Sequence, residues 1–117
     1  MNIETLRNYC ITKPGVTESF PFGEDTLVFK IADKIFLLTS LSEPNRFNVK
    51  CDPEIAVILR EEHPEIIPGY HMNKRHWNTV YLDGSLSEQL IRQQIDQSYN
   101  LVFKSLSKIK QQEIIAL

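Results

Sequence analysis

The sequence predicts a single two-layer α+β domain over residues 1–117, a sandwich with a largely antiparallel five-stranded sheet and the element order α-β(3)-α-β(2)-α. Two observations carry this fold class. Residues 26–51 contain short segments of alternating apolar and polar residues joined by tight turns, which is typical of an antiparallel meander with one buried face. The helical patterns are also too few and too clustered to supply the crossovers of a parallel sheet. The length suits one hydrophobic core.

The first expected element is a short helix over residues 3–11. Ile3 and Leu6 begin an apolar pattern at helical spacing, and Asn2 precedes it as an N-cap. The Pro14-Gly15 pair ends the helix, because proline cannot continue it and glycine accepts the turn.

Residues 16–25 are expected to form a loop with two phenylalanines around a proline. We expect Phe20 and Phe22 to plug the edge of the core while Pro21 stiffens the chain. The alternative is that this segment forms the rim of a binding cleft.

Three strands are expected at residues 26–32, 35–40 and 46–51. The middle strand starts with a continuous apolar run, which favours a covered or central position. The outer two alternate, and this predicts which side chains face the core. Leu27, Phe29, Ile31, Phe47, Val49 and Cys51 are expected to point inward, and Arg46, Asn48 and Lys50 outward.

The Asp52-Pro53 pair predicts the start of a second helix, with a side-chain cap followed by proline at the first helical position. We expect Ile55, Ile58 and Leu59 to form its buried stripe, and the helix to end before Pro64.

Prolines and a glycine exclude a helix over residues 64–76, and we expect a short extended segment at residues 69–73. A strand follows at residues 77–82, with Trp77 and Tyr81 on the face opposite Val80. The longest helix is expected over residues 87–105, where isoleucine, tyrosine and valine recur near the 3.6-residue period. Residues 107–117 begin with a possible cap, Ser107, and are expected to form a short helix or to fray.

Composition is that of an ordinary globular protein, with 42% hydrophobic and 24% charged residues. We expect no membrane span, since no apolar run is long enough, and no export, since the N-terminus lacks an apolar signal core. Cys10 and Cys51 are expected to be reduced core thiols. The net charge of −2 argues against indiscriminate nucleic-acid binding, although a local basic face remains compatible with it.

No motif in the sequence indicates catalysis, a metal or a cofactor. The three histidines, His63, His71 and His76, have gaps that match no zinc signature. A nucleophile elbow and a phosphate-binding glycine loop are also absent. We therefore expect a protein that is not an enzyme.

The residue types do indicate a binding surface. Residues 63–84 hold all three histidines, the only tryptophan and an adjacent lysine–arginine pair. If the apolar strand faces pack on the helices, the opposite face carries cations interleaved with flat rings, which suits phosphate contact and base stacking. That face would show Lys30, Arg46, Asn48, Lys50, Trp77 and Tyr81, with Lys74, Arg75 and His76 adjoining it. The alternative is an ordinary solvated strand face.

Several segments also resemble the MmcQ/YjbR family. They are Pro14-Gly15-Val16-Thr17-Glu18 with Phe20-Pro21-Phe22-Gly23, then Lys50-Cys51-Asp52-Pro53, and then residues 68–80, which contain His71-Met72-Asn73-Lys74-Arg75-His76-Trp77-Asn78. The resemblance spans nearly the whole chain. It implies a cytoplasmic bacterial domain with a YjbR-like, secretion-chaperone-like sandwich and a DNA-binding role. The family motif maps onto Tyr70, His71, Lys74, Arg75, His76, Trp77 and Asn78.

The expected function is thus weak, non-enzymatic DNA binding through the basic and aromatic face. The candidate contact residues are Lys30, Arg46, Lys50, Tyr70, His71, Lys74, Arg75, His76, Trp77 and Asn78. The alternative is a protein-interaction module without nucleic-acid binding, in which the apolar segment 109–117 docks a protein partner or a second copy as a homodimer.

Overall fold

The computed structural model describes all residues, 1–117, and contains one antiparallel sheet of six strands in the order β1-β2-β3-β4-β6-β5. The strands are β1 (Val16–Ser19), β2 (Thr26–Ile31), β3 (Lys34–Ser40), β4 (Glu43–Lys50), β5 (Ile66–Pro68) and β6 (Trp77–Tyr81). The helices are α1 (Ile3–Ile11), α2 (Pro53–Glu62), α3 (Glu88–Ser105) and α4 (Lys108–Ile115). The predicted α+β class is confirmed, and the predicted count of five strands is wrong.

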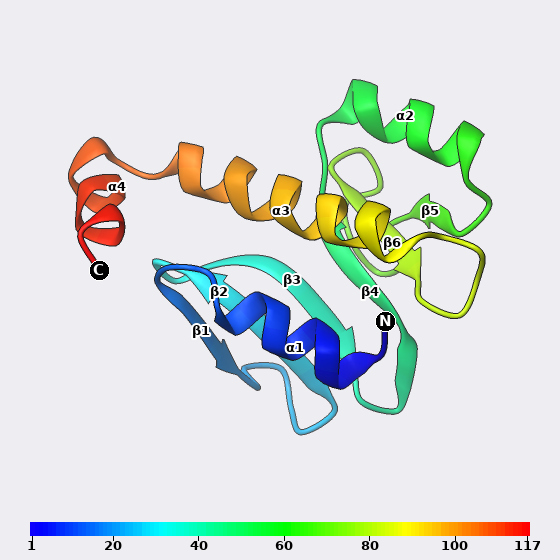
Figure 1. Cartoon of the computed structure of the whole chain (residues 1–117), viewed down its shortest axis with the longest axis horizontal. Helices are drawn as coiled ribbons and strands as arrows, with labels where there is room; N and C mark the ends of the chain where they lie inside the picture. Colours follow the sequence, from blue (N-terminus) through cyan, green and yellow to red (C-terminus); the bar gives the residue numbers. More distant parts are fainter.

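Helices α1 and α3 pack on one face of the sheet, and α4 closes the end of that layer (Figure 1). The core is one cluster of 16 buried residues drawn from α1, α3, α4 and the inward strand positions. The alternation predicted for β2 and β4 is correct, because Leu27, Phe29, Phe47 and Val49 are all buried in this cluster. None of the four helices combines the length and apolar character that crossing a membrane requires.

The three cap residues expected from the sequence, Asn2, Asp52 and Ser107, each begin a helix. The Asn2 side chain accepts a hydrogen bond from the backbone N–H of Thr5 at 2.9 Å, and Asp52 accepts one from Glu54 at 2.9 Å. Ser87 and Ser107 cap α3 and α4 in the same way. These side chains satisfy amide groups that the first turn of a helix leaves free, so the predicted starts hold to within a residue.

The sequence misplaced two short strands. Residues 16–19 were expected in a loop but pair with β2 along its edge, from Val16 opposite Ile31 to Ser19 opposite Val28. Their side chains are mostly exposed, so no alternation marks them. The extended segment expected at residues 69–73 is a turn, and the strand lies before it at Ile66–Pro68. A three-residue strand is too short for periodicity to reveal.

Two burial predictions are also wrong. In α2 the buried residue is Ala56, and Ile55 and Ile58 are 41% and 54% exposed, because the helix lies at the edge of the molecule beside β5. Of the predicted stripe only Leu59 packs against the core, where it is partly buried. Phe20 and Phe22 do not plug the core, since their side chains are 48% and 66% exposed. The loop that carries them projects past the strand ends instead.

The C-terminal segment forms helix α4 and contributes to the core. Ile114 is buried, and its side chain lies so close to Gly15 that a Cβ atom there would stand 3.3 Å from it. Glycine at position 15 thus permits α4 to dock beside the α1–β1 connection. Ile109, Ile115 and Leu117 remain exposed.

Candidate functional site

The face of the sheet away from α1 and α3 carries the polar and aromatic side chains that alternation predicts for it. In the β4–β6 pairing, Arg46 lies opposite Tyr81, and Lys50 lies opposite Trp77. Between these two pairs, Asn48 lies opposite Thr79. Because paired residues of an antiparallel sheet share a face, these six side chains form adjacent rows on the open side. Lys30 joins the same face from β2, where it neighbours Ile35.

A groove of about 610 Å³ lies on this open face. The residues 69–76 form a turn that borders the groove on one side, and the loop before β2 borders it on the other. Phe22, Leu38, Tyr70, His71 and Met72 supply the apolar and aromatic part of the lining. Asp25, Ser40, Ser42, Glu43, Arg46 and Asn48 supply most of the polar part. The volume is in the range typical of small-ligand pockets.

A short polar relay fixes the position of Tyr70 at the groove. The Thr79 hydroxyl donates to the Asn48 side-chain oxygen at 2.5 Å and accepts from the Tyr70 backbone N–H at 2.8 Å. The Asn48 side-chain amide in turn donates to the Tyr70 carbonyl at 3.3 Å. Both backbone groups of Tyr70 are therefore held by the sheet, and the residue remains 49% exposed.

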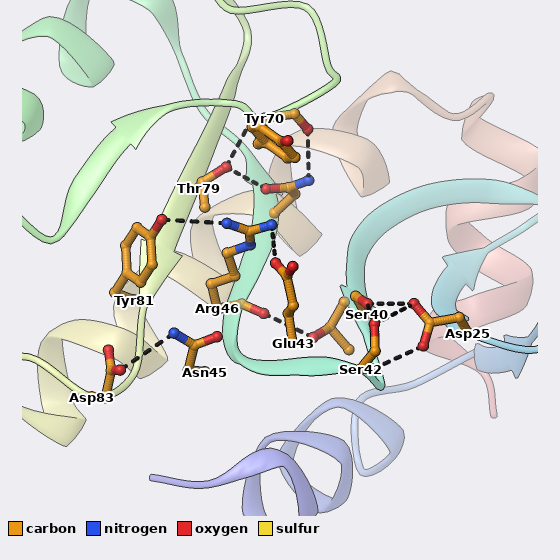
Figure 2. A network of polar contacts seen from close by, with 12 residues as sticks. Asp25, Ser40, Ser42, Glu43, Asn45, Arg46, Tyr70, Thr79, Tyr81 and Asp83 are labelled. Carbon is orange, nitrogen blue, oxygen red and sulfur yellow. Dashed lines mark hydrogen bonds and ion pairs between the residues drawn. The ribbon is translucent and has the colours of Figure 1, made fainter.

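Arg46 is the one arginine or lysine in the lining of the groove. Its guanidinium carbon lies 4.6 Å from the centre of the Tyr70 ring, a cation–π arrangement. Figure 2 shows the guanidinium between Tyr81 and Glu43. It donates to the Tyr81 hydroxyl at 3.4 Å and forms an ion pair with Glu43. The hydrogen bond with Tyr81 and the charge of Glu43 both raise the pKa of Arg46 above its ordinary value.

Asp25 holds the other end of the groove together. Its carboxylate accepts from the Ser40 hydroxyl at 2.5 Å, from the Ser42 hydroxyl at 3.0 Å and from the Ser42 backbone N–H at 2.8 Å (Figure 2). These bonds lower the pKa of Asp25, the one from Ser40 contributing most. They tie the loop before β2 to the β3–β4 turn, and so fix the rim that carries Phe22.

Eight of the ten predicted contact residues separate into three groups. Arg46, Tyr70 and His71 come together in the groove. Lys74, Arg75 and His76 are solvent-exposed in the adjoining turn, where the Lys74 amine also donates to the Gly69 carbonyl at 3.0 Å. Lys30 and Lys50 are partly exposed on the open face, outside the groove lining.

Trp77 and Asn78 do not present the surface that the sequence predicted. Trp77 is on the open face but only 9% exposed, so its ring is not free to stack. Asn78 is fully buried on the helix-facing side, where its side-chain oxygen accepts from Arg60 at 2.8 Å. Arg60 also donates to the Lys74 and Trp77 carbonyls at 2.5 and 3.1 Å. Through these hydrogen bonds Arg60 and Asn78 hold the turn of residues 69–76 in place, which is a structural role.

Sequence reasoning missed several groove residues, among them Phe22, Asp25, Leu38, Glu43 and Met72. One signal was available for Phe22, because the paired phenylalanines of residues 16–25 did suggest the rim of a cleft as an alternative. Glu43 and Asp25 carried no such signal, since isolated acidic residues at turns are common. No three histidine, cysteine or acidic side chains approach closely enough to hold a metal ion.

Fold and groove together define a small α+β domain with a groove on the open face of its sheet, and solved structures share the fold. A Deinococcus radiodurans protein aligns with a TM-score of 0.89 and 39% identity, over 96% of this chain and 86% of that one. A Pseudomonas syringae protein aligns with a TM-score of 0.75 and 30% identity, over 86% and 98% of the two chains.

Sequence relatives agree with the structural ones. The Escherichia coli protein YbdF is 41% identical over 95% of this chain and 92% of its own length. The Escherichia coli protein YjbR is 36% identical over the full length of both chains. The YjbR family model matches residues 11–101. This chain belongs to the YjbR family.

Proposed function

We propose that this protein binds single-stranded nucleic acid, without chemical action on it, through the groove and the cationic turn beside it. The observation that carries this proposal is the pairing of an arginine with exposed aromatic rings. Arg46 lies over Tyr70, and the Phe22 ring lines the same groove. Flat rings and a guanidinium are the groups on which unpaired bases stack in sequence-tolerant complexes.

The cations beside the groove supply the second requirement, which is contact with phosphate. Lys74 and Arg75 are exposed in the turn that ends at Trp77, and that turn borders the groove. The chain as a whole carries a net charge of −2, so attraction for a polyanion must be local. Affinity should accordingly be modest and strongly dependent on salt.

Two features favour single strands over duplex. Bases can reach Tyr70 and Phe22 only when they are unpaired, whereas a duplex would offer only its phosphates to this face. The carboxylates of Asp25 and Glu43 line part of the groove, and they would repel a continuous row of phosphates. The DNA binding expected from the sequence is therefore narrowed here to unpaired strands.

The test is a salt titration with labelled single-stranded and duplex oligonucleotides, followed by fluorescence anisotropy. With about three to five phosphate contacts, the log–log slope for single strands should lie between about −2 and −3.5. Replacing both Lys74 and Arg75 by alanine should flatten that slope by about 1.4. The stability of this variant should fall by no more than about 1.5 kcal/mol, because both side chains are exposed and only the bond from Lys74 to the Gly69 carbonyl is lost.

The matched control removes two lysines elsewhere. Lys108 and Lys110 are exposed on α4, at the far end of α3 from β6 (Figure 1), so their replacement by alanine changes the net charge equally. Its slope should match the wild type. Absence of binding to any oligonucleotide at about 50 mM salt contradicts the proposal, as does an equal loss in both double variants.

A further inference from the structure

We propose that the groove is a single-nucleotide pocket, in which Arg46 exchanges Glu43 for a phosphate of the ligand while the base lies against Tyr70 and Phe22. The inference deepens the proposed function and rests on it for the source of the nucleotide, a strand. The chemistry recognised is a flat heteroaromatic base joined to a phosphate.

The apolar lining of the groove is the first argument. Phe22 is 66% exposed and Tyr70 is 49% exposed, although both rings line a cavity of about 610 Å³. Burying such rings against a flat ligand removes apolar surface from water, and base–aromatic stacking adds about 1–3 kcal/mol per base. The Tyr70 backbone is already fixed by Thr79 and Asn48, so the ring is positioned before any ligand arrives.

The state of Arg46 is the second argument. Its guanidinium is oriented by the Tyr70 ring and the Tyr81 hydroxyl, and its charge is balanced by Glu43. The Glu43 side chain is 53% exposed and the Arg46 side chain is 24% exposed, so the pair is open to solvent from the Glu43 side, and solvent-exposed ion pairs contribute little to stability. A phosphate can therefore replace this carboxylate at little cost, since arginine binds both anions with the same planar donors. Glu43 acts as an internal competitor of the ligand.

Two other polar residues of the groove, Asp25 and Asn48, fit this exchange. Asp25 is satisfied by three donors from Ser40 and Ser42, so it does not compete for Arg46. The Asn48 side-chain amide donates only one of its two hydrogens, to the Tyr70 carbonyl. The other hydrogen is available to an acceptor on the edge of a base. Asn48 would then contribute a preference among bases.

The experiment compares charge and ring variants with matched controls. Glu43→Gln should tighten binding of a single-stranded oligonucleotide about two- to fivefold, because it removes the competing carboxylate. Glu61→Gln makes the same chemical change on an exposed residue of α2 and should have no effect. Phe22→Ala should weaken binding at least about fivefold, while Phe20→Ala, in the same loop but outside the groove lining, should not.

A double-mutant cycle separates exchange at Arg46 from a general change in charge. In an Arg46→Ala background, Glu43→Gln should no longer tighten binding. If the gain persists there, it arises from net charge, and the exchange is overturned. Melting temperatures of each variant show that it is folded, and Glu43, Glu61, Phe20 and Phe22 are all exposed, so loss of folding is not expected.

Nucleoside 5′-monophosphates form the second arm and identify the source of the nucleotide. Binding of oligonucleotides with this variant pattern supports both proposals. Binding of oligonucleotides that neither Glu43→Gln nor Phe22→Ala alters overturns the pocket and leaves the proposed function standing. Binding of monophosphates alone, with the variant pattern, supports the pocket as a free-nucleotide site and overturns the proposed function. Binding of neither ligand overturns both.

Discussion

At the scale of single residues, the two cysteines show what burial does to reactivity. Burial raises the pKa of Cys10 to about 12 and that of Cys51 to about 11, from an ordinary value of 9.0. Both thiols are free and buried, as the sequence predicted. They therefore remain neutral at any pH near 7, and a neutral thiol is a poor nucleophile.

We expect stability to fall as the pH rises above about 9. Thiols of the unfolded chain lose their protons near 9.0, whereas the folded thiols keep theirs to about 11 or 12, so the unfolded state binds fewer protons in this interval. Urea midpoints at about pH 8 and 10.5 measure the effect. The variant with both cysteines replaced by alanine should lose less stability over the same interval, and an equal loss would assign the effect to other groups such as Tyr9.

At the scale of elements, one serine connects the long helix to the sheet. The hydroxyl of Ser98 donates to the Phe36 carbonyl of β3 at 2.5 Å and accepts from the Lys50 backbone N–H of β4 at 2.8 Å. Ser98 is fully buried, so water cannot reach these two backbone groups to take the place of its hydroxyl. The crossing of α3 over the two central strands is thus fixed by hydrogen bonds as well as by apolar packing.

Replacing Ser98 by alanine should destabilise the fold by about 1–3 kcal/mol, because it leaves two buried backbone groups without partners. Equilibrium denaturation in urea measures this loss. Ser105→Ala is the matched control on the same helix, since Ser105 is exposed. Its hydroxyl donates to the Val102 carbonyl within its own turn and accepts only a long, exposed bond of 3.4 Å from the Lys34 amine. A loss below about 0.5 kcal/mol for Ser98→Ala would show that the strands satisfy those groups themselves.

At the scale of the whole molecule, α4 has two different surfaces. Ile114 belongs to the core, while Ile109, Ile115 and Leu117 are 72%, 72% and 82% exposed. The buried side closes the end of the domain beside Gly15. The exposed side is the part of the apolar C-terminal segment that remains free for the homodimer considered from the sequence.

Deleting residues 107–117 should lower the melting temperature, because removing Ile114 exposes the adjoining core. Loss of one buried isoleucine corresponds to about 2–5 kcal/mol. A truncation as stable as the full chain contradicts the structural role of α4.

Light scattering of the full chain and of the Ile109→Ser/Ile115→Ser variant tests the homodimer without disturbing Ile114. A strictly monomeric full chain rules out the homodimer.

The sequence by itself determined the elements with strong local signals. Alternation in residues 26–31 and 46–50 set the buried faces, and the cap at Asp52 set the start of α2. Such signals are local, because side-chain period and capping chemistry act within one element. The same alternation placed Arg46 and Lys50 on the open face.

Only the tertiary structure decided what covers each face and which distant residues meet. Strand β1 exists because its backbone pairs with β2, and its exposed side chains gave no pattern. Ile55 is 41% exposed because it lines an open groove between α2 and α3 instead of entering the core. Trp77 is only 9% exposed, although its face was predicted correctly. Phe22 and Tyr70 are 48 residues apart in the sequence but line one groove. They meet because the loop before β2 and the turn before β6 belong to strands of the same sheet. Long-range pairing and packing depend on the whole chain, so the periodicity of a single segment cannot predict them.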